Sequence, residues 1–180
     1  MAELKRKLDY SDLQVTPDDG KRYELVRGGM LVTPSPSPVH QRISKRLQRQ
    51  LEAYFETRSL GEVFNAPIDL ILTEQDVFVP DLLVVSDPAH ISRRGIEAPP
   101  VLVVEILSPS TRAQDCGLKA RRYAELGVEH YWIVDPERER LECHRLAEGV
   151  FRPLVDAEGE ATLEHPTWGG LAIDLGTLWR

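Results

Sequence analysis

The stretch Val101-Leu-Val-Val-Glu-Ile-Leu-Ser108 decides the fold class, because its apolar residues run almost without interruption and only Glu105 breaks them. A nearly continuous apolar run of this length is expected for a strand that is covered on both faces. The stretch Val77–Val85 has the same character and contains one acidic residue, Asp81. Two such strands indicate the interior of an α/β sheet.

Helical and further strand patterns surround these two strands. Residues from about 40 to 58 place apolar side chains at i, i+3, i+4 and i+7, which predicts a helix. A second helix is predicted from about Arg112 to Leu126, ending at Gly127. We predict two more strands, Glu62 to Leu72 and Tyr131 to Asp135. The order helix, three strands, helix, strand indicates an α/β domain with a mixed central sheet.

Hairpins are predicted at both ends of this core. Apolar runs on either side of Gly28-Gly29 indicate an N-terminal hairpin, and Leu141–Leu146 with Val150–Leu154 indicate a C-terminal one. The proline-rich segment 33–38 must be extended and is interpreted as a linker to the first helix. We expect residues 1–180 to form a single domain with its core at about residues 20–155.

Composition excludes several classes of protein. The chain has 22 basic and 29 acidic residues and a formal charge of −7, so any nucleic-acid binding must depend on a local patch or a metal. Cys116 and Cys143 form no C-x-x-C pair, which excludes a zinc ribbon and a disulfide scaffold. No apolar run approaches the roughly 20 residues of a membrane span, and the first residues lack the apolar core of a signal peptide. We therefore expect a cytoplasmic protein with reduced thiols and no membrane contact.

The two acids in the apolar strands are the first candidate site residues. Burying an ionised carboxylate among valines is unfavourable unless a cation or strong donors compensate. Asp81 and Glu105 on adjacent strands could face each other, and a divalent cation would then explain both. Mg²⁺ is usually held by one or two carboxylates together with waters and substrate phosphates. Alternatively, each acid pairs with an arginine or accepts a hydrogen bond from a backbone amide.

Lys119 is the next candidate. Asp115, Lys119 and Tyr123 are spaced i, i+4, i+8 on the second predicted helix, so they share one side. Lys119 lies at the border of the apolar arc, where its ammonium could reach into a cleft. The alternative is a plain salt bridge between Asp115 and Lys119, which contributes only about 0.3–0.5 kcal/mol.

Two further residues and a basic stripe complete the candidates. His40 begins the first helix, and Glu24 lies on the hairpin. Each is either a structural residue or a site residue. Glu24 would be a third metal-site acid if the hairpin folds over the cleft. One side of the first helix carries four basic residues, Arg42, Lys45, Arg46 and Arg49. This stripe is either a solvated face or a surface that follows a phosphate backbone.

In combination these features resemble a known group. Pro80-Asp81, followed on the next strand by Glu105-Ile106-Leu107, resembles the PD-(D/E)XK nuclease superfamily. More narrowly, the sequence is similar to a widespread bacterial family of restriction endonucleases that was first defined as a domain of unknown function. The strings that carry this likeness span about residues 10–155: Tyr23-Glu24-Leu25 with Gly28, Pro36-Ser37-Pro38 with His40, Val79-Pro80-Asp81-Leu82, Val104–Thr111, and Asp115, Lys119 and Tyr123 with Gly127–Trp132.

The resemblance implies a restriction-endonuclease-like core and a Mg²⁺-dependent phosphodiesterase that cleaves DNA, with Mn²⁺ as an alternative metal. It implies Asp81 and Glu105 as metal ligands and the carbonyl of Ile106 as a further ligand. The superfamily has a lysine where this chain has Leu107, and in the narrower family the lysine lies on the following helix, so Lys119 is the implied substitute. Nucleases of this fold often act as dimers, so a homodimer is expected.

The resemblance also implies roles for the remaining candidates. Glu24 and His40 would position water or support the metal ligands, and the basic stripe would hold the DNA backbone. Two other hypotheses stay open. In the first, the protein is a catalytically inactive nuclease-fold module for DNA binding or assembly, which the charge of −7 and Leu107 favour. In the second, the protein hydrolyses another phosphate ester or a nucleotide.

Overall fold

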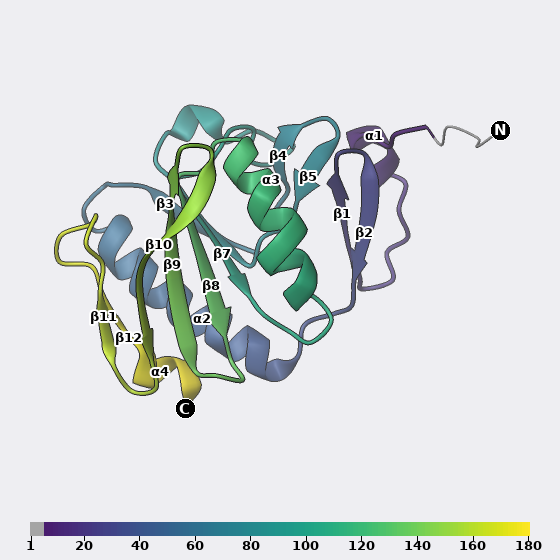
Figure 1. The fold of residues 1–180 in the computed structure, drawn as a ribbon. Helices are drawn as coiled ribbons and strands as arrows, with labels where there is room; N and C mark the ends of the chain where they lie inside the picture. The colour runs from purple at the N-terminus through teal and green to yellow at the C-terminus, as the bar shows by residue number, and fades with distance from the viewer. Residues whose placement is uncertain (1–5) are drawn as a thin grey trace.

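The computed structural model describes residues 6–180, and a six-stranded mixed sheet forms its centre (Figure 1). The strand order is β10-β9-β8-β7-β6-β3, and β7 and β8 are its one parallel pair. The strands are β3 (Glu62–Asn65), β6 (Leu82–Val85), β7 (Leu102–Ile106), β8 (His130–Asp135), β9 (Arg140–Ala147) and β10 (Val150–Glu158). The predicted α/β class with a mixed central sheet is confirmed.

Helices cover both faces of this sheet. In Figure 1, α2 (Pro38–Phe55) lies behind the sheet, and α3 (Ala120–Glu125) lies in front of it, preceded by a π-helix at Gln114–Lys119. A short 3₁₀ helix, Pro88–His90, and α1 (Tyr10–Leu13) lie in connecting segments. No helix among residues 6–180 is both long enough and apolar enough to cross a bilayer.

A second, four-stranded sheet stands beside the first, in the order β2-β1-β5-β4. Its strands are β1 (Arg22–Val26), β2 (Gly29–Thr33), β4 (Leu70–Thr73) and β5 (Asp76–Phe78). The predictions of single strands at Glu62–Leu72 and Val77–Val85 are wrong, because each stretch contributes one strand to each sheet. Both breaks contain a proline, Pro67 and Pro80, which cannot donate a ladder hydrogen bond.

The predicted N-terminal hairpin is present, with its turn one residue earlier than expected. Val26 pairs with Gly29, so Arg27 and Gly28 form the two-residue turn, with φ angles of 53° and 77°. Positive φ at both positions is typical of the turn that matches the twist of a hairpin. A Cβ on Gly28 would lie 2.6 Å from the Cβ of Lys7, so this position needs glycine for space as well as for conformation.

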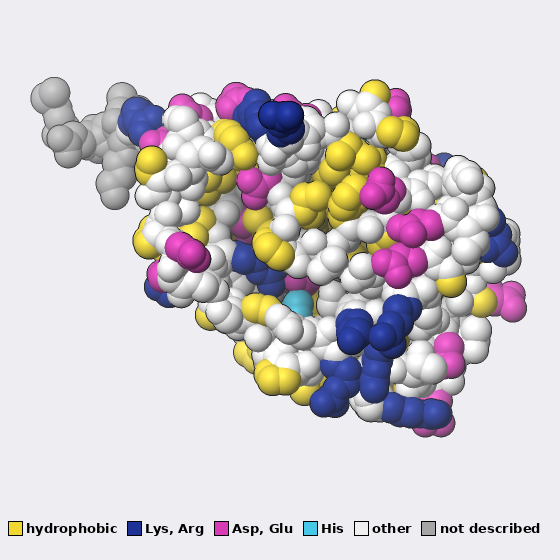
Figure 2. All heavy atoms as spheres, turned by 180° about the vertical axis from the view of Figure 1, so that it is seen from behind, with side chains coloured by type: hydrophobic (Ala, Val, Ile, Leu, Met, Phe, Trp, Pro, Cys, Tyr) yellow, Lys and Arg dark blue, Asp and Glu magenta, His cyan; other side chains and the backbone are white. Residues whose placement is uncertain are grey.

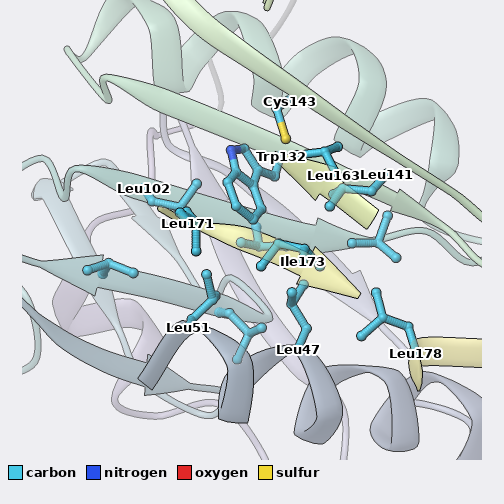
Figure 3. Packing of buried hydrophobic residues seen from close by; sticks show 14 of the residues in the cluster. Leu47, Leu51, Leu102, Trp132, Leu141, Cys143, Leu163, Leu171, Ile173 and Leu178 are labelled. Carbon is cyan, nitrogen blue, oxygen red and sulfur yellow. The ribbon is translucent and has the colours of Figure 1, made fainter. Parts of the chain in front are cut away.

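One hydrophobic core cluster lies between α2 and the central sheet and includes the C-terminal segment (Figure 3), and a second lies between the sheet and α3. Leu47 and Leu51 of α2 are fully buried and point toward Ile173 and Trp132. The C-terminal elements are β11 (Thr162–Glu164), β12 (Ala172–Asp174) and α4 (Leu175–Trp179). Each buried leucine contributes about 1.5–3 kcal/mol, so this tail is an integral part of the core, which extends beyond residue 155.

Candidate active site

Five predicted site residues lie together around one cavity of about 310 Å³. Its wall is formed by the β1–β2 hairpin, the start of α2, the connection between β5 and β6, the end of β7, and the π-helix before α3. The lining includes Glu24, His40, Asp81, Glu105 and Lys119, together with Asp115. Each of these side chains is almost fully buried, so the tertiary fold turns charged groups from five segments inward.

Asp81 occupies the gap between β5 and β6 and has a full set of donors. Its Oδ2 accepts hydrogen bonds from the backbone nitrogen of Ile106 at 2.8 Å and from His40 Nε2 at 3.0 Å. Its Oδ1 is 2.8 Å from Arg22 Nη1. Burial alone would raise the pKa of this carboxyl, but His40 and Arg22 hold the pKa below its usual value. Asp81 therefore remains a carboxylate although it is buried.

Lys119 lies at the centre of the acids. Its ammonium Nζ is 2.9 Å from Glu24, 3.2 Å from Glu105 and 3.3 Å from Asp115. Burial lowers the pKa of an amine, but here the three carboxylates outweigh burial and raise it. The contact with Asp115 is the i, i+4 pair that the spacing predicts. Lys119 is therefore a permanent cation that joins the hairpin, β7 and the π-helix.

Glu105 projects from β7 toward Lys119 and Tyr123. Its Oε1 accepts hydrogen bonds from Lys119 Nζ and, at 3.0 Å, from the hydroxyl of Tyr123. Burial raises the pKa of Glu105 well above its usual range, and the neighbouring acids Asp115 and Asp81 raise it further. Among residues 6–180, no hydrogen bond reaches its second oxygen, Oε2. This carboxyl thus needs additional positive charge to ionise and keeps one oxygen for a ligand.

Arg22 is a site residue that the sequence analysis missed. Its guanidinium contacts Asp81 and also donates to the carbonyl of Val79 at 3.1 Å. Arg22 and Glu24 are two residues apart on β1, and Glu24 accepts a hydrogen bond from the nitrogen of Val79 at 2.9 Å. Because alternate residues of a strand share a face, placing Glu24 in the site predicts Arg22 beside it.

The donor set of the site fits a hard divalent cation. With all four carboxyl groups ionised, Glu24, Asp81, Glu105 and Asp115 would exceed the two permanent cations, Arg22 and Lys119, by two negative charges, which is the charge that one divalent cation balances. Among residues 6–180, no group of three or more His, Cys, Asp or Glu is arranged to hold a metal by itself. Mg²⁺ does not need such a group, because it binds through one or two carboxylates and completes its shell with water and phosphate.

The structure also shows the surroundings of Ile106 and Leu107, the two residues that follow Glu105. The nitrogen of Ile106 donates to Asp81, which fixes this end of β7 against the start of β6. Leu107 is 5% exposed, lines the cavity and packs in the core between the sheet and α3. The apolar side chain of Leu107 is therefore buried at this position, and the ammonium group of the site comes from Lys119 on the π-helix. The contacts that the sequence analysis gave as the alternative to a metal are also present at Asp81. This residue pairs with an arginine and accepts a hydrogen bond from a backbone amide.

The predicted basic stripe lies on α2. Among residues 6–180, no ion pair joins Arg42, Lys45, Arg46 or Arg49 to an acid, whereas Arg112 and Arg122 are both paired in this acidic chain. Figure 2 shows Lys and Arg side chains gathered on the face where α2 lies, with a histidine visible next to them. Four unneutralised cations on one helix form a local positive surface despite the overall charge of −7.

Comparisons with known proteins agree with this architecture. The structure is similar to the crystal structure of "a putative nuclease belonging to DUF820" from Anabaena variabilis ATCC 29413, with a TM-score of 0.75 and 17% sequence identity. The match covers 96% of this chain and 97% of that chain, and at this identity it shows a shared fold. No curated protein matches the chain. The family model described as "Uma2: Putative restriction endonuclease" matches residues 9–176, so the chain belongs to the Uma2 family.

Proposed function

We propose that this protein is an endonuclease that hydrolyses phosphodiester bonds in DNA with the help of a divalent cation, Mg²⁺ or alternatively Mn²⁺. The observation that carries the proposal is the convergence of Asp81, Glu105 and Lys119 on one cavity, where the carboxyl oxygens suit a hard divalent cation. The family and the fold are the context that favours a nuclease over other uses of such a site.

In this proposal Asp81 and Glu105 hold the metal, with the carbonyl of Ile106 as a further ligand. When bound, the metal would polarise a non-bridging phosphate oxygen and lower the pKa of a coordinated water. His40 and the backbone of Ile106 fix the orientation of the Asp81 carboxylate by hydrogen bonds. This preorganisation keeps the ligand in place before a substrate arrives.

Lys119 acts as an electrostatic group in this mechanism and not as a base. Its raised pKa keeps the amine protonated at neutral pH, so it cannot take a proton from water. A fixed ammonium beside the metal ligands instead stabilises the negative charge that develops on the phosphate. Glu24 and Asp115 hold the ammonium in position from the hairpin and from the π-helix.

The test uses the full-length protein with covalently closed circular DNA, both single-stranded and double-stranded, in Mg²⁺, Mn²⁺ or EDTA. We expect cleavage that depends on the metal and falls to background in Asp81→Asn and in Glu105→Gln. Glu137→Gln is the matched control, because Glu137 lines the rim of the same cavity with a side chain that is 64% exposed. Cleavage that persists in both site variants would contradict the assignment.

Two other outcomes identify the competing functions. Hydrolysis of small phosphodiesters without cleavage of DNA would indicate another phosphate-ester hydrolase. A melting temperature that does not respond to Mn²⁺, together with DNA binding, would indicate an inactive module, since a ligand that binds the folded state raises its stability. The homodimer and the cytoplasmic location stay predictions from the sequence.

A further inference from the structure

A groove of about 790 Å³ adjoins the cavity of the candidate active site. The groove and the cavity share part of their walls, namely Arg22, Ser35, Pro36, His40 and Asp81. Any chain that lies in the groove therefore leads directly to the buried carboxylates.

One side of α2 forms the long wall of this groove. The residues that line it are spaced i, i+1, i+4, i+5 and i+8, which places them on one helical face: His40, Gln41, Ser44, Lys45 and Gln48. At about 1.5 Å per residue, the wall extends roughly 12 Å away from the site.

Polar and basic groups line the opposite walls. Lys21 and Arg22 at the start of β1 and Asn65 at the end of β3 belong to these walls. Lys45 faces this groove and has no acidic partner among residues 6–180. Asp18 and Asp81 also line the groove, but ammonium, guanidinium and amide donors outnumber them. The lining within residues 6–180 contains no Phe, Tyr or Trp, so recognition depends on phosphates and base edges more than on stacking.

The burial of the site residues favours one strand over two. Asp81, Glu105 and Lys119 are only 2–4% exposed, so a phosphate on the outside of an intact duplex cannot approach them closely. A single strand can bend its backbone into the cavity that adjoins the groove.

We propose that the substrate is an unpaired DNA strand, which lies along α2 in the groove and delivers its scissile phosphate into the cavity. Lys45 binds backbone phosphates along α2, and the amides of Gln41, Gln48 and Asn65 contact base edges. This inference rests on the proposed nuclease function and specifies the substrate form for the same site.

The cleavage experiment compares three circles of equal sequence: single-stranded DNA, a relaxed closed duplex, and the same duplex with an unpaired bubble. We expect the single strand and the bubble to be cut, and the intact duplex to be cut more slowly by about tenfold for each base-pair step that must open. Equal or faster cleavage of the relaxed duplex would overturn the inference while leaving the nuclease function intact.

A binding experiment in EDTA decides the inference independently of catalysis. We expect a labelled single strand to bind more tightly than its duplex in fluorescence anisotropy, and Lys45→Glu to weaken binding of the single strand. The slope of log K against log salt should fall in magnitude by about 0.7–1, the value for one lost phosphate contact.

Arg121→Glu is the matched control for charge reversal, because Arg121 is an exposed arginine of α3 outside the groove and has no ion pair among residues 6–180. It should leave both affinity and slope unchanged. Absence of cleavage on every circle would refute the proposed function, and the binding result would still decide the groove. Equal affinity for the single strand and the duplex would overturn the groove assignment. An equal loss of affinity in Lys45→Glu and Arg121→Glu would overturn it as well.

Discussion

The carboxylate of Asp81 accepts a hydrogen bond from the backbone nitrogen of Ile106, 2.8 Å away, although 25 positions separate the two residues. The contact crosses from the start of β6 to the end of β7, where these strands run antiparallel. Because Glu105 precedes Ile106, this single hydrogen bond fixes the two predicted metal ligands at the same end of the sheet.

Asp81→Asn should separate the charge of this residue from its position. The amide oxygen of asparagine can still accept from Ile106, so we expect the fold to persist. The rise in melting temperature that we expect Mn²⁺ to produce in the wild type should be lost, because the variant removes one of the two proposed anionic ligands. Differential scanning fluorimetry with a Mn²⁺ titration measures this, and an undiminished shift would exclude Asp81 as a ligand. Glu137→Gln should respond to Mn²⁺ as the wild type does.

Lys119→Met should destabilise the protein strongly. Removing the ammonium leaves the carboxylates of Glu24, Glu105 and Asp115 buried together without their common partner. Breaking a buried ion pair by deleting one member typically costs about 3–5 kcal/mol of unfolding free energy.

Urea denaturation in EDTA measures the effect of Lys119→Met. Lys45→Met is the matched control, because Lys45 is exposed and unpaired among residues 6–180, and it should change the free energy of unfolding by less than about 0.5 kcal/mol. Equal stability of the two variants would show that Lys119 is not the electrostatic centre of the site.

Arg22→Gln should increase the affinity for Mn²⁺. The guanidinium lies 2.8 Å from Asp81 Oδ1, so a cation bound to Asp81 would be repelled by a like charge a few ångströms away. Glutamine can still donate a hydrogen bond to Asp81 but carries no charge. We expect Mn²⁺ to bind at least about tenfold more tightly, equivalent to about 1.4 kcal/mol. Isothermal titration calorimetry measures this, and unchanged or weaker binding would contradict the expected competition.

The stability of the protein should fall between pH 6.5 and about 4 because of two buried histidines. Burial lowers the pKa of His130 and of His165 to about 4, and both rings pack against Trp168. The unfolded chain therefore binds protons that the folded protein does not, so stability is full above pH 6.5 and decreases as the pH falls. We expect a loss on the order of 2 kcal/mol for each histidine.

Urea denaturation at several pH values tests this dependence. His165→Gln should flatten the decrease between pH 6.5 and 4, because one of the two groups no longer titrates. His90→Asn is the control, since its side chain is 38% exposed, and it should leave the slope unchanged. A wild-type protein of constant stability over this range would refute the argument.

Local sequence patterns determined much of the fold. The apolar spacing of α2, the apolar runs of β7 and β8, and the two hairpins could all be read from the sequence, because each depends on neighbours within a few residues. Asp81, Glu105 and Lys119 were recognisable because a charged residue inside or beside an apolar pattern demands compensation. The fold and the family that these features predicted are confirmed.

Only the tertiary structure decided how these pieces meet. The division of Val77–Val85 between two sheets, the contact of Arg22 with Asp81, and the ion pair between Glu24 and Lys119 join segments that are far apart in the chain. The burial of the C-terminal segment against α2 is of the same kind. Periodicity reports which side of an element is apolar, but not which distant element covers it. The choice of partner depends on complementary shape and charge between surfaces that form only when the whole chain has folded.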